Sequence, residues 1–277
     1  MMTRILTAAV ALAIFIPALI FSHTLFFDIF IAAGSFIGTI ELLKCVGVMD
    51  KHTISAPSMF VSFIVPLLFR YVSNETIMLI VIAYLFYLLY AAVFARKENS
   101  TNDIALCFFA TVFVTICFTS IIITRTLPYG DILYLMIFIG AWSTDTFAYF
   151  TGKIFGKHKL LPDISPKKTI EGAIGGIIFC SLSFMLYGFI IARLNRFDAE
   201  PNYILLACAG VATSVIAQLG DLSASAIKRN YGIKDFGTIF PGHGGILDRC
   251  DSVMAVAPVI TIIGAIFLKF SGYGLFT

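Results

Sequence analysis

Residues 76–95 read TIMLIVIAYLFYLLYAAVFA, a run of 20 positions without a charged side chain. An α-helix needs about 20 apolar residues to cross the hydrocarbon core of a bilayer. The run is continuously apolar and lacks the alternation of polar and apolar residues that is typical of barrel strands. This stretch therefore predicts a transmembrane helix, and it indicates that the chain is a membrane protein.

The composition of the whole chain points the same way. Of its 277 residues, 59% are hydrophobic and 13% are charged, against about a quarter charged in an ordinary soluble domain. A water-soluble globule, a disordered chain and a disulfide scaffold are all excluded. The net charge of +3 gives no indication of a nucleic-acid partner. The six cysteines form no CxxC pair, so we interpret them as buried thiols rather than zinc ligands or disulfides.

The same criterion applied along the chain predicts an all-α polytopic membrane protein with about nine transmembrane helices. Pro17 and the lack of a cleavage site favour an uncleaved first helix over a signal peptide. The third and eighth spans are interrupted by prolines and by the polar residues 218–221, respectively. The nine spans are 5–22, 25–43, 54–70, 76–95, 104–123, 131–151, 171–193, 202–226 and 251–270.

No linker, repeat or soluble domain is visible, so 1–277 is predicted to be a single integral membrane domain. We divide it into N-terminal transmembrane helices, 1–130, and a C-terminal catalytic transmembrane region, 131–277. If the nine helices alternate, 14 of the 19 basic residues fall on one side of the membrane and 5 on the other. Because positive charge collects on the cytoplasmic side, we expect a cytoplasmic N-terminus.

Four aspartates stand at or near the membrane edge on that basic side: Asp145, Asp221, Asp248 and Asp251. Asp248 and Asp251 are spaced i,i+3, which places both carboxylates on one face of a helix. Charged groups in membrane segments are costly and mark functional sites. Carboxylates beside lysines and arginines have the composition of a magnesium–phosphate site, in which the cation takes a few carboxylates and phosphate oxygens.

The opposing interpretation is salt bridging at the interface. Asp221, Ser225 and Lys228 share a helical face by their spacing, so an Asp221–Lys228 pair can form, as can an Asp248–Arg249 pair. Such pairs explain one isolated acid well. They explain four acids beside two basic loops less well.

Two loops add phosphate-binding features. Residues 241–245, PGHGG, precede a helix predicted to begin near Ile246, where backbone N–H groups face an anion. A plain tight turn, with His243 as a hydrogen-bonded loop residue, is the other interpretation. Two GxxxG pairs, at 34–38 and at 172–176, favour close helix packing over ligand binding.

Residues 165–169, SPKKT, predict a loop-to-helix entry, with Ser165 as N-cap and Pro166 at the first helical position. Plain capping is one interpretation of this segment. The two adjacent lysines, Lys167 and Lys168, could also hold a nucleotide phosphate there.

Residues 225–251 read S-x-x-K-R-x4-K-D-x5-P-G-H-G-G-x-x-D-R-x-D, which resembles the signature of the phosphatidate cytidylyltransferase (CDP-diacylglycerol synthase) family. Blocks at 145–149, 156–159, 165–172 and 218–221 are also similar to that family. Cys250 departs from the family's pattern, since an aliphatic residue, Met, Phe or Thr usually stands there, but it leaves the i,i+3 spacing intact.

The resemblance implies that CTP and phosphatidate give CDP-diacylglycerol and pyrophosphate in a cytoplasmic-facing site of the cell membrane, with Mg²⁺ as cofactor and a homodimer as the assembly. We expect Asp221 and Asp248 to hold the principal metal, and Asp145 and Asp251 to complete a second cation site or its surroundings. The residues expected to be catalytic are Asp221, Asp248, Asp251 and Lys228. Those expected to bind substrate are Ser165, Lys167, Lys168, Ser225, Arg229, Lys234, His243, Gly244, Gly245 and Arg249.

Other functions remain open at this point. A transporter or cation pathway would depend on Asp28, Glu41 and Asp145 more than on the basic loops. A related membrane enzyme acting on a polyprenol or an archaeal lipid would share the catalytic loops. A structural membrane scaffold would not need clustered acids.

Overall fold

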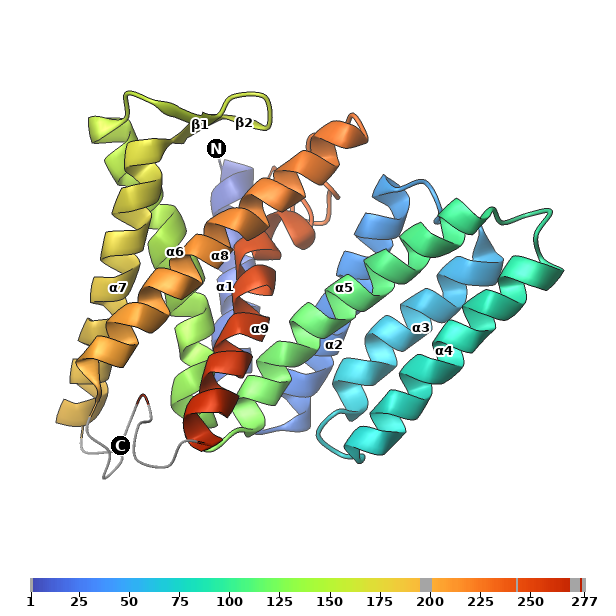
Figure 1. The fold of residues 1–277 in the computed structure, drawn as a ribbon, viewed down its shortest axis with the longest axis horizontal. Helices are drawn as coiled ribbons and strands as arrows, with labels where there is room; N and C mark the ends of the chain where they lie inside the picture. The colour runs from blue at the N-terminus through green and yellow to red at the C-terminus, as the bar shows by residue number, and fades with distance from the viewer. Residues whose placement is uncertain (1, 195–200, 243, 270–274, 276–277) are drawn as a thin grey trace. The chain divides into compact units, whose positions relative to one another are not determined.

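The computed structural model describes residues 2–194, 201–242, 244–269 and 275. In this part of the chain nine helices and two short strands follow one another (Figure 1). They are α1 (Met2–Ile20), α2 (Leu25–Cys45), α3 (His52–Leu68), α4 (Asn74–Phe94), α5 (Thr101–Thr126), α6 (Gly130–Phe155), β1 (Lys159–Leu161), β2 (Ser165–Thr169), α7 (Ile170–Arg193), α8 (Tyr203–Asn230) and α9 (Leu247–Lys269).

Seven of the described helices are long and apolar enough to cross a membrane: α2, α4, α5, α6, α7, α8 and α9. The predicted spans 5–22 and 54–70 correspond to α1, which has 19 residues, and to α3, which has 17. The apolar stretch Ala9–Ile20 of α1 and the whole of α3 are shorter than this length. In α4 only Tyr84, Leu88 and Ala91 are buried, while Phe94 is 73% exposed. An exposed apolar surface of this extent on a 21-residue helix is typical of a segment that faces lipid. The predicted all-α, multi-pass membrane fold is confirmed.

The polar residues 218–221 do not interrupt α8, which runs without a break for 28 residues. The side chain of Gln218 donates hydrogen bonds to the carbonyl oxygen of Ala173 (3.2 Å) and to Ser214 Oγ (3.3 Å). The amide nitrogen of Gln218 is therefore hydrogen-bonded inside the protein, which lowers the cost of a polar side chain in this part of α8. The predicted end at residue 226 is four residues short.

Contacts along the chain define two compact units. Unit 1 comprises the residues up to 123 together with 228–250, and unit 2 comprises 124–227 together with the residues from 251 onward. Each is described by itself.

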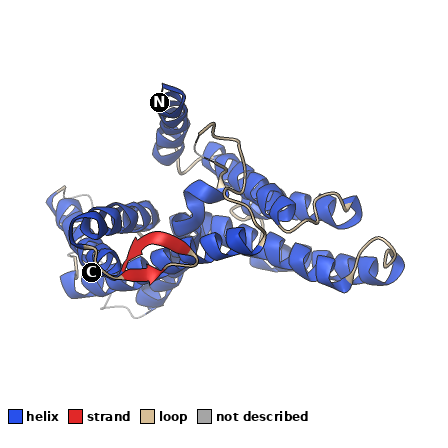
Figure 2. Cartoon of the chain, turned by 90° about the horizontal axis from the view of Figure 1, so that it is seen from above, coloured by secondary structure: helices blue, strands red, loops and turns tan. Residues whose placement is uncertain are grey.

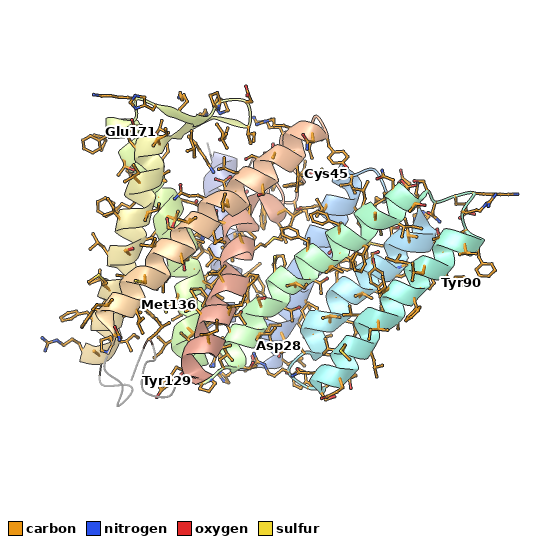
Figure 3. The ribbon with its side chains drawn as sticks, viewed as in Figure 1. Asp28, Cys45, Tyr90, Tyr129, Met136 and Glu171 are labelled. Atoms are coloured by element: carbon orange, nitrogen blue, oxygen red, sulfur yellow. The ribbon has the colours of Figure 1, made fainter. Side chains whose placement is uncertain are left out.

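In unit 1, α2 packs on α3, and α3 packs on α4. Gly34 and Gly38 bring α2 close to its neighbours: a Cβ at Gly34 would meet the Phe118 ring at 2.8 Å, and one at Gly38 would meet Leu247 at 3.0 Å. The predicted packing role of this glycine pair is confirmed. Figure 3 labels Asp28 near one end of α2 and Cys45 at the other.

In unit 2, α6 and α7 pack along their length. Gly172 and Gly176 lie against the backbone of α6, with a Cβ at Gly172 placed 2.7 Å from the Ala148 carbonyl oxygen and one at Gly176 placed 3.2 Å from the Thr144 carbonyl oxygen. This pair too serves close helix packing, as predicted. The β1–β2 hairpin connects the two helices and is drawn in red in Figure 2.

The predicted helix entry at residues 165–169 is wrong. Ser165 is not an N-cap, because these residues form β2, which pairs antiparallel with β1. The N-cap of α7 is Thr169, whose Oγ1 accepts a hydrogen bond from Gly172 N at 3.1 Å. Both strands of a two-stranded hairpin are edges, so Pro166 is tolerated inside β2. Glu171, labelled in Figure 3, accepts hydrogen bonds from the backbone N–H of Lys157 and His158 and so fixes the hairpin to the start of α7.

Candidate functional site

Charged residues predicted from the sequence meet in unit 2 around Asp221, a group that we call the Asp221 cluster (Asp145, Lys168, Asp221 and Ser252). The ammonium of Lys168, from β2, lies 2.5 Å from Asp221 Oδ2, from α8. Both side chains are about a quarter exposed, at 26% and 28%. The hairpin therefore carries Lys168 to a carboxylate that a ligand can still reach.

Asp145 of α6 joins the same cluster. Its Oδ1 accepts a hydrogen bond from Ser252 Oγ of α9 at 3.3 Å, and it interacts electrostatically with Asp221 and Lys168. Beside Asp221, Gly220 allows α8 to approach α9, since a Cβ there would lie 3.0 Å from the carbonyl oxygen of Asp251. Three helices and the hairpin thus bring two carboxylates and one ammonium together.

In unit 1 the central group is Asp248, in the first turn of α9. Its Oδ1 lies 2.7 Å from Lys228 Nζ, and its Oδ2 accepts hydrogen bonds from Phe236 N (2.7 Å) and Gly245 N (3.0 Å). The Asp248 side chain is 2% exposed and that of Lys228 is 12% exposed. Asp248 therefore ties the end of α8 and two points of the 236–245 loop to α9.

Next to Asp248, the carboxylate of Glu41 reaches the N-terminus of α9 from α2. It accepts hydrogen bonds from Ile246 N (3.0 Å) and Leu247 N (2.9 Å), and the residue is 3% exposed. The sequence predicts an anion site at the start of this helix, after the loop 241–245. In the structure the backbone N–H groups of residues 245–247 donate to these two carboxylates.

The signature residues of both clusters lie within a similarity that covers nearly the whole chain. The sequence model of the cytidylyltransferase family matches residues 2–267. The chain belongs to the cytidylyltransferase family. A phosphatidate cytidylyltransferase of Staphylococcus haemolyticus is 40% identical over 269 residues, which cover 95% of this chain and 98% of the relative. Proteins of the same name from Staphylococcus aureus strain COL and from Staphylococcus saprophyticus are 39% and 38% identical over equal shares of their lengths.

The structure brings together about half of the residues expected from the family signature. Asp145, Lys168 and Asp221 meet in unit 2, and Lys228, Gly245 and Asp248 meet in unit 1. A Cβ at Gly244 would lie 2.8 Å from Asp248 Oδ2, so Gly244 also borders that group. Lys167, Arg229, Lys234 and Arg249 are exposed, whereas Ser165, Ser225 and Asp251 are half-buried. His243 lies outside the described residues.

A divalent cation fits the donor set of the Asp221 cluster. No group of three or more His, Cys, Asp or Glu side chains suited to a metal occurs among the residues described. Mg²⁺ needs fewer, because it takes one or two carboxylates and completes its shell with water and substrate phosphates. Asp145 and Asp221 supply two carboxylates. The oxygens of Asp248 both accept bonds from protein donors, and its predicted pairing with Asp221 on one metal stays a prediction.

Three residues of these groups escaped the sequence reasoning. Nothing in the sequence marks Ser252 or Phe236 as a site residue, because Ser252 contributes only a hydroxyl and Phe236 only a backbone N–H. Glu41 was visible as a charge in an apolar span, but its partners lie 205 and 206 positions away.

Proposed function

We propose that the chain is a phosphatidate cytidylyltransferase, which transfers the cytidylyl group of CTP to phosphatidate and releases pyrophosphate. The observation that carries the proposal is the end-to-end similarity to bacterial proteins of that name, at 40% identity over 95% of this chain. The site supports it, because each unit holds a lysine paired with an aspartate of the family signature.

The reaction sets an electrostatic problem. The nucleophile is a phosphate monoester whose second pKa is about 6, so it is largely ionised near neutral pH and needs no strong general base. The barrier comes from joining two anions and from the charge that develops on the departing pyrophosphate. Preorganised cations and dipoles lower such a barrier.

The Asp221 cluster is built for this task. The ammonium of Lys168 and the carboxylate of Asp221 form an ion pair in the structure. Asp221 would hold a divalent cation, and Lys168 would then be available to a phosphate oxygen. Asp145 adds the second carboxylate. A bound Mg²⁺ would supply charge neutralisation of the triphosphate.

The Asp248 group has a different role in the proposal. Lys228, Phe236 N and Gly245 N are all bound to Asp248, so this group fixes residues 236 and 245 and the end of α8 relative to the start of α9. The exposed basic residues of the same segment, Lys234 and Arg249, remain accessible to phosphate.

The proposal places the basic loops and the N-terminus on the cytoplasmic side, where CTP is available while the acyl chains stay in lipid. The 14-to-5 division of basic residues supports this orientation. With single cysteines in a cysteine-free background, an impermeant maleimide applied to intact cells should label position 74 and spare position 159. The reverse pattern would invert the topology.

The homodimer is part of the proposal as well, and cross-linking in native membranes tests it.

A cation pathway would need buried acids that are open to a moving ion. Asp28 instead pairs with Arg70 at 3.1 Å and accepts a hydrogen bond from Tyr71 at 2.9 Å. Glu41 binds backbone N–H groups. Two of the three acids that this alternative depends on are therefore engaged in structural contacts.

The test uses purified protein in mixed micelles with phosphatidate, CTP and Mg²⁺. Pyrophosphate and CDP-diacylglycerol should appear in equal amounts, and a polyprenol or diacylglycerol in place of phosphatidate should give neither. Asp221→Asn should lower the rate strongly, while Asp163→Asn, which changes an exposed aspartate of the hairpin, should leave it unchanged. Release of CDP from CTP in the presence of a polyprenol would indicate a kinase and contradict the proposal.

A further inference from the structure

The N-terminus of α9 is capped by the carboxylate of Glu41, a residue about 200 positions earlier in the sequence. The first N–H groups of a helix have no partner within the helix and carry partial positive charge. At the start of α9 the N–H groups of Ile246, the residue before the helix, and of Leu247 donate to the two oxygens of Glu41, at 3.0 and 2.9 Å. The side chain belongs to α2, so the cap joins two segments of unit 1 that are distant in sequence.

The surroundings of Glu41 are shaped to its carboxylate. The residue is 3% exposed, and burying a charge is costly unless strong hydrogen bonds compensate it. Gly237 and Gly245 both lie directly against this side chain, and a Cβ at either position would collide with it. Glu41 therefore contacts the loop at Gly237 and Gly245 and also binds the N–H groups at the start of α9.

Glu41 and Asp248 divide the donors at this helix end between them. Glu41 accepts hydrogen bonds from Ile246 N and Leu247 N. Asp248 accepts hydrogen bonds from Gly245 N and Phe236 N and forms an ion pair with Lys228. If Glu41 is removed, two buried donors lose their partner, and Asp248 is the nearest anion of this group to compensate them. The loop conformation and the Lys228–Asp248 pair would then change together.

We infer that Glu41 is a positioning residue for the described part of the signature segment, residues 236–242 and 244–249. Its carboxylate caps α9 and thereby fixes Gly237, Gly245, Asp248 and Lys228 in the arrangement that turnover requires. The inference rests on the proposed function for its kinetic part and on geometry alone for its structural part. Glu41 contacts the backbone of the segment and acts through it.

The experiment compares Glu41→Ala and Glu41→Gln with wild type in the full-length protein. Hydrogen exchange at the amides of Ile246 and Leu247 should be at least about tenfold faster in Glu41→Ala, the factor that corresponds to the loss of one charge-assisted hydrogen bond. The kcat for CDP-diacylglycerol formation should fall by at least about tenfold as well. Glu41→Gln keeps one carbonyl acceptor, so it should recover part of the exchange protection and part of kcat.

Asp28→Asn is the matched control, because Asp28 is a fully buried acid of the same helix whose partners, Arg70 and Tyr71, lie outside the signature segment. It should leave the exchange of residues 245–247 and kcat within about twofold of wild type. Equal losses in Asp28→Asn and Glu41→Ala would reduce the effect to general destabilisation of α2 and overturn the inference.

Unchanged exchange and kcat in Glu41→Ala would overturn it too. If Glu41→Ala does not fold, Glu41→Gln decides by the same two measurements. If wild type forms no CDP-diacylglycerol, the proposed function fails, whereas the exchange of Ile246 and Leu247 still decides whether Glu41 is the cap.

Discussion

Asp248 can act as a metal ligand or as a residue that holds the loop in place, and replacing it distinguishes the two roles. The sequence alone makes it a ligand, and in that role Asp248→Asn should abolish turnover while the fold stays unchanged. In the structure its carboxylate accepts bonds from Lys228 Nζ, Phe236 N and Gly245 N. We therefore predict that Asp248→Asn loosens the loop as well as stopping the reaction.

The magnitude follows from the donor count. Asparagine offers one oxygen where aspartate offers two, so its amide nitrogen must face either Lys228 or the two backbone N–H groups. If the amide oxygen of the asparagine keeps the two backbone hydrogen bonds, its NH₂ group faces the ammonium of Lys228, whose side chain is 12% exposed. Breaking a buried pair costs about 3–5 kcal/mol. Since Lys228 retains some contact with solvent, we expect about 2–4 kcal/mol for this segment.

The assay is amide hydrogen exchange in detergent micelles, read at Phe236 and Gly245. A local loss of about 2 kcal/mol corresponds to exchange that is about 30-fold faster. Asp235→Asn, an exposed aspartate of the same loop, is the control and should exchange like wild type. If Asp248→Asn loses activity but keeps wild-type exchange at both amides, the carboxylate does not hold the loop, and this reasoning is refuted.

Three further changes test the other parts of the account. Lys168→Gln removes the cation paired with Asp221 and should raise the KM for CTP by about tenfold with a smaller change in kcat; an unchanged KM would remove Lys168 from the nucleotide site. Gly220→Ala places a methyl group against Asp251 O and the side chain of Ala255 and should lower stability by about 1–3 kcal/mol, measured by thermal unfolding in detergent; a variant as stable as wild type would show that the α8–α9 contact is loose. Chelation of divalent cations with EDTA should stop turnover, and added Mg²⁺ should restore it; full activity in EDTA would contradict the role given to Asp145 and Asp221.

The helices were the most predictable part of the fold. In a bilayer each spanning segment must be apolar along most of its length and must satisfy its own backbone, so hydropathy alone places the ends within a few residues. The span predicted at 76–95 is α4, Asn74–Phe94, in the structure. The same physics explains α8, where the internal hydrogen bonds of Gln218 allow polar residues inside a continuous helix.

The hairpin and the cap of α9 were beyond sequence reasoning for different reasons. Ser165 and Pro166 have the composition of a helix start, but pairing with β1 decides the conformation of that segment. Glu41 could be recognised as an unusual charge in an apolar helix. Its role depends on N–H groups more than 200 positions away, and no local pattern encodes such a pairing.

The measurement that tests the central claim most directly is the fate of labelled CTP. With purified protein, phosphatidate and Mg²⁺, label in the α-phosphate of CTP should enter the organic phase as CDP-diacylglycerol, and label in the γ-phosphate should stay in water as pyrophosphate. Transfer of the γ-phosphate to lipid, or entry of the α-label into lipid without phosphatidate, would contradict the assignment as a phosphatidate cytidylyltransferase.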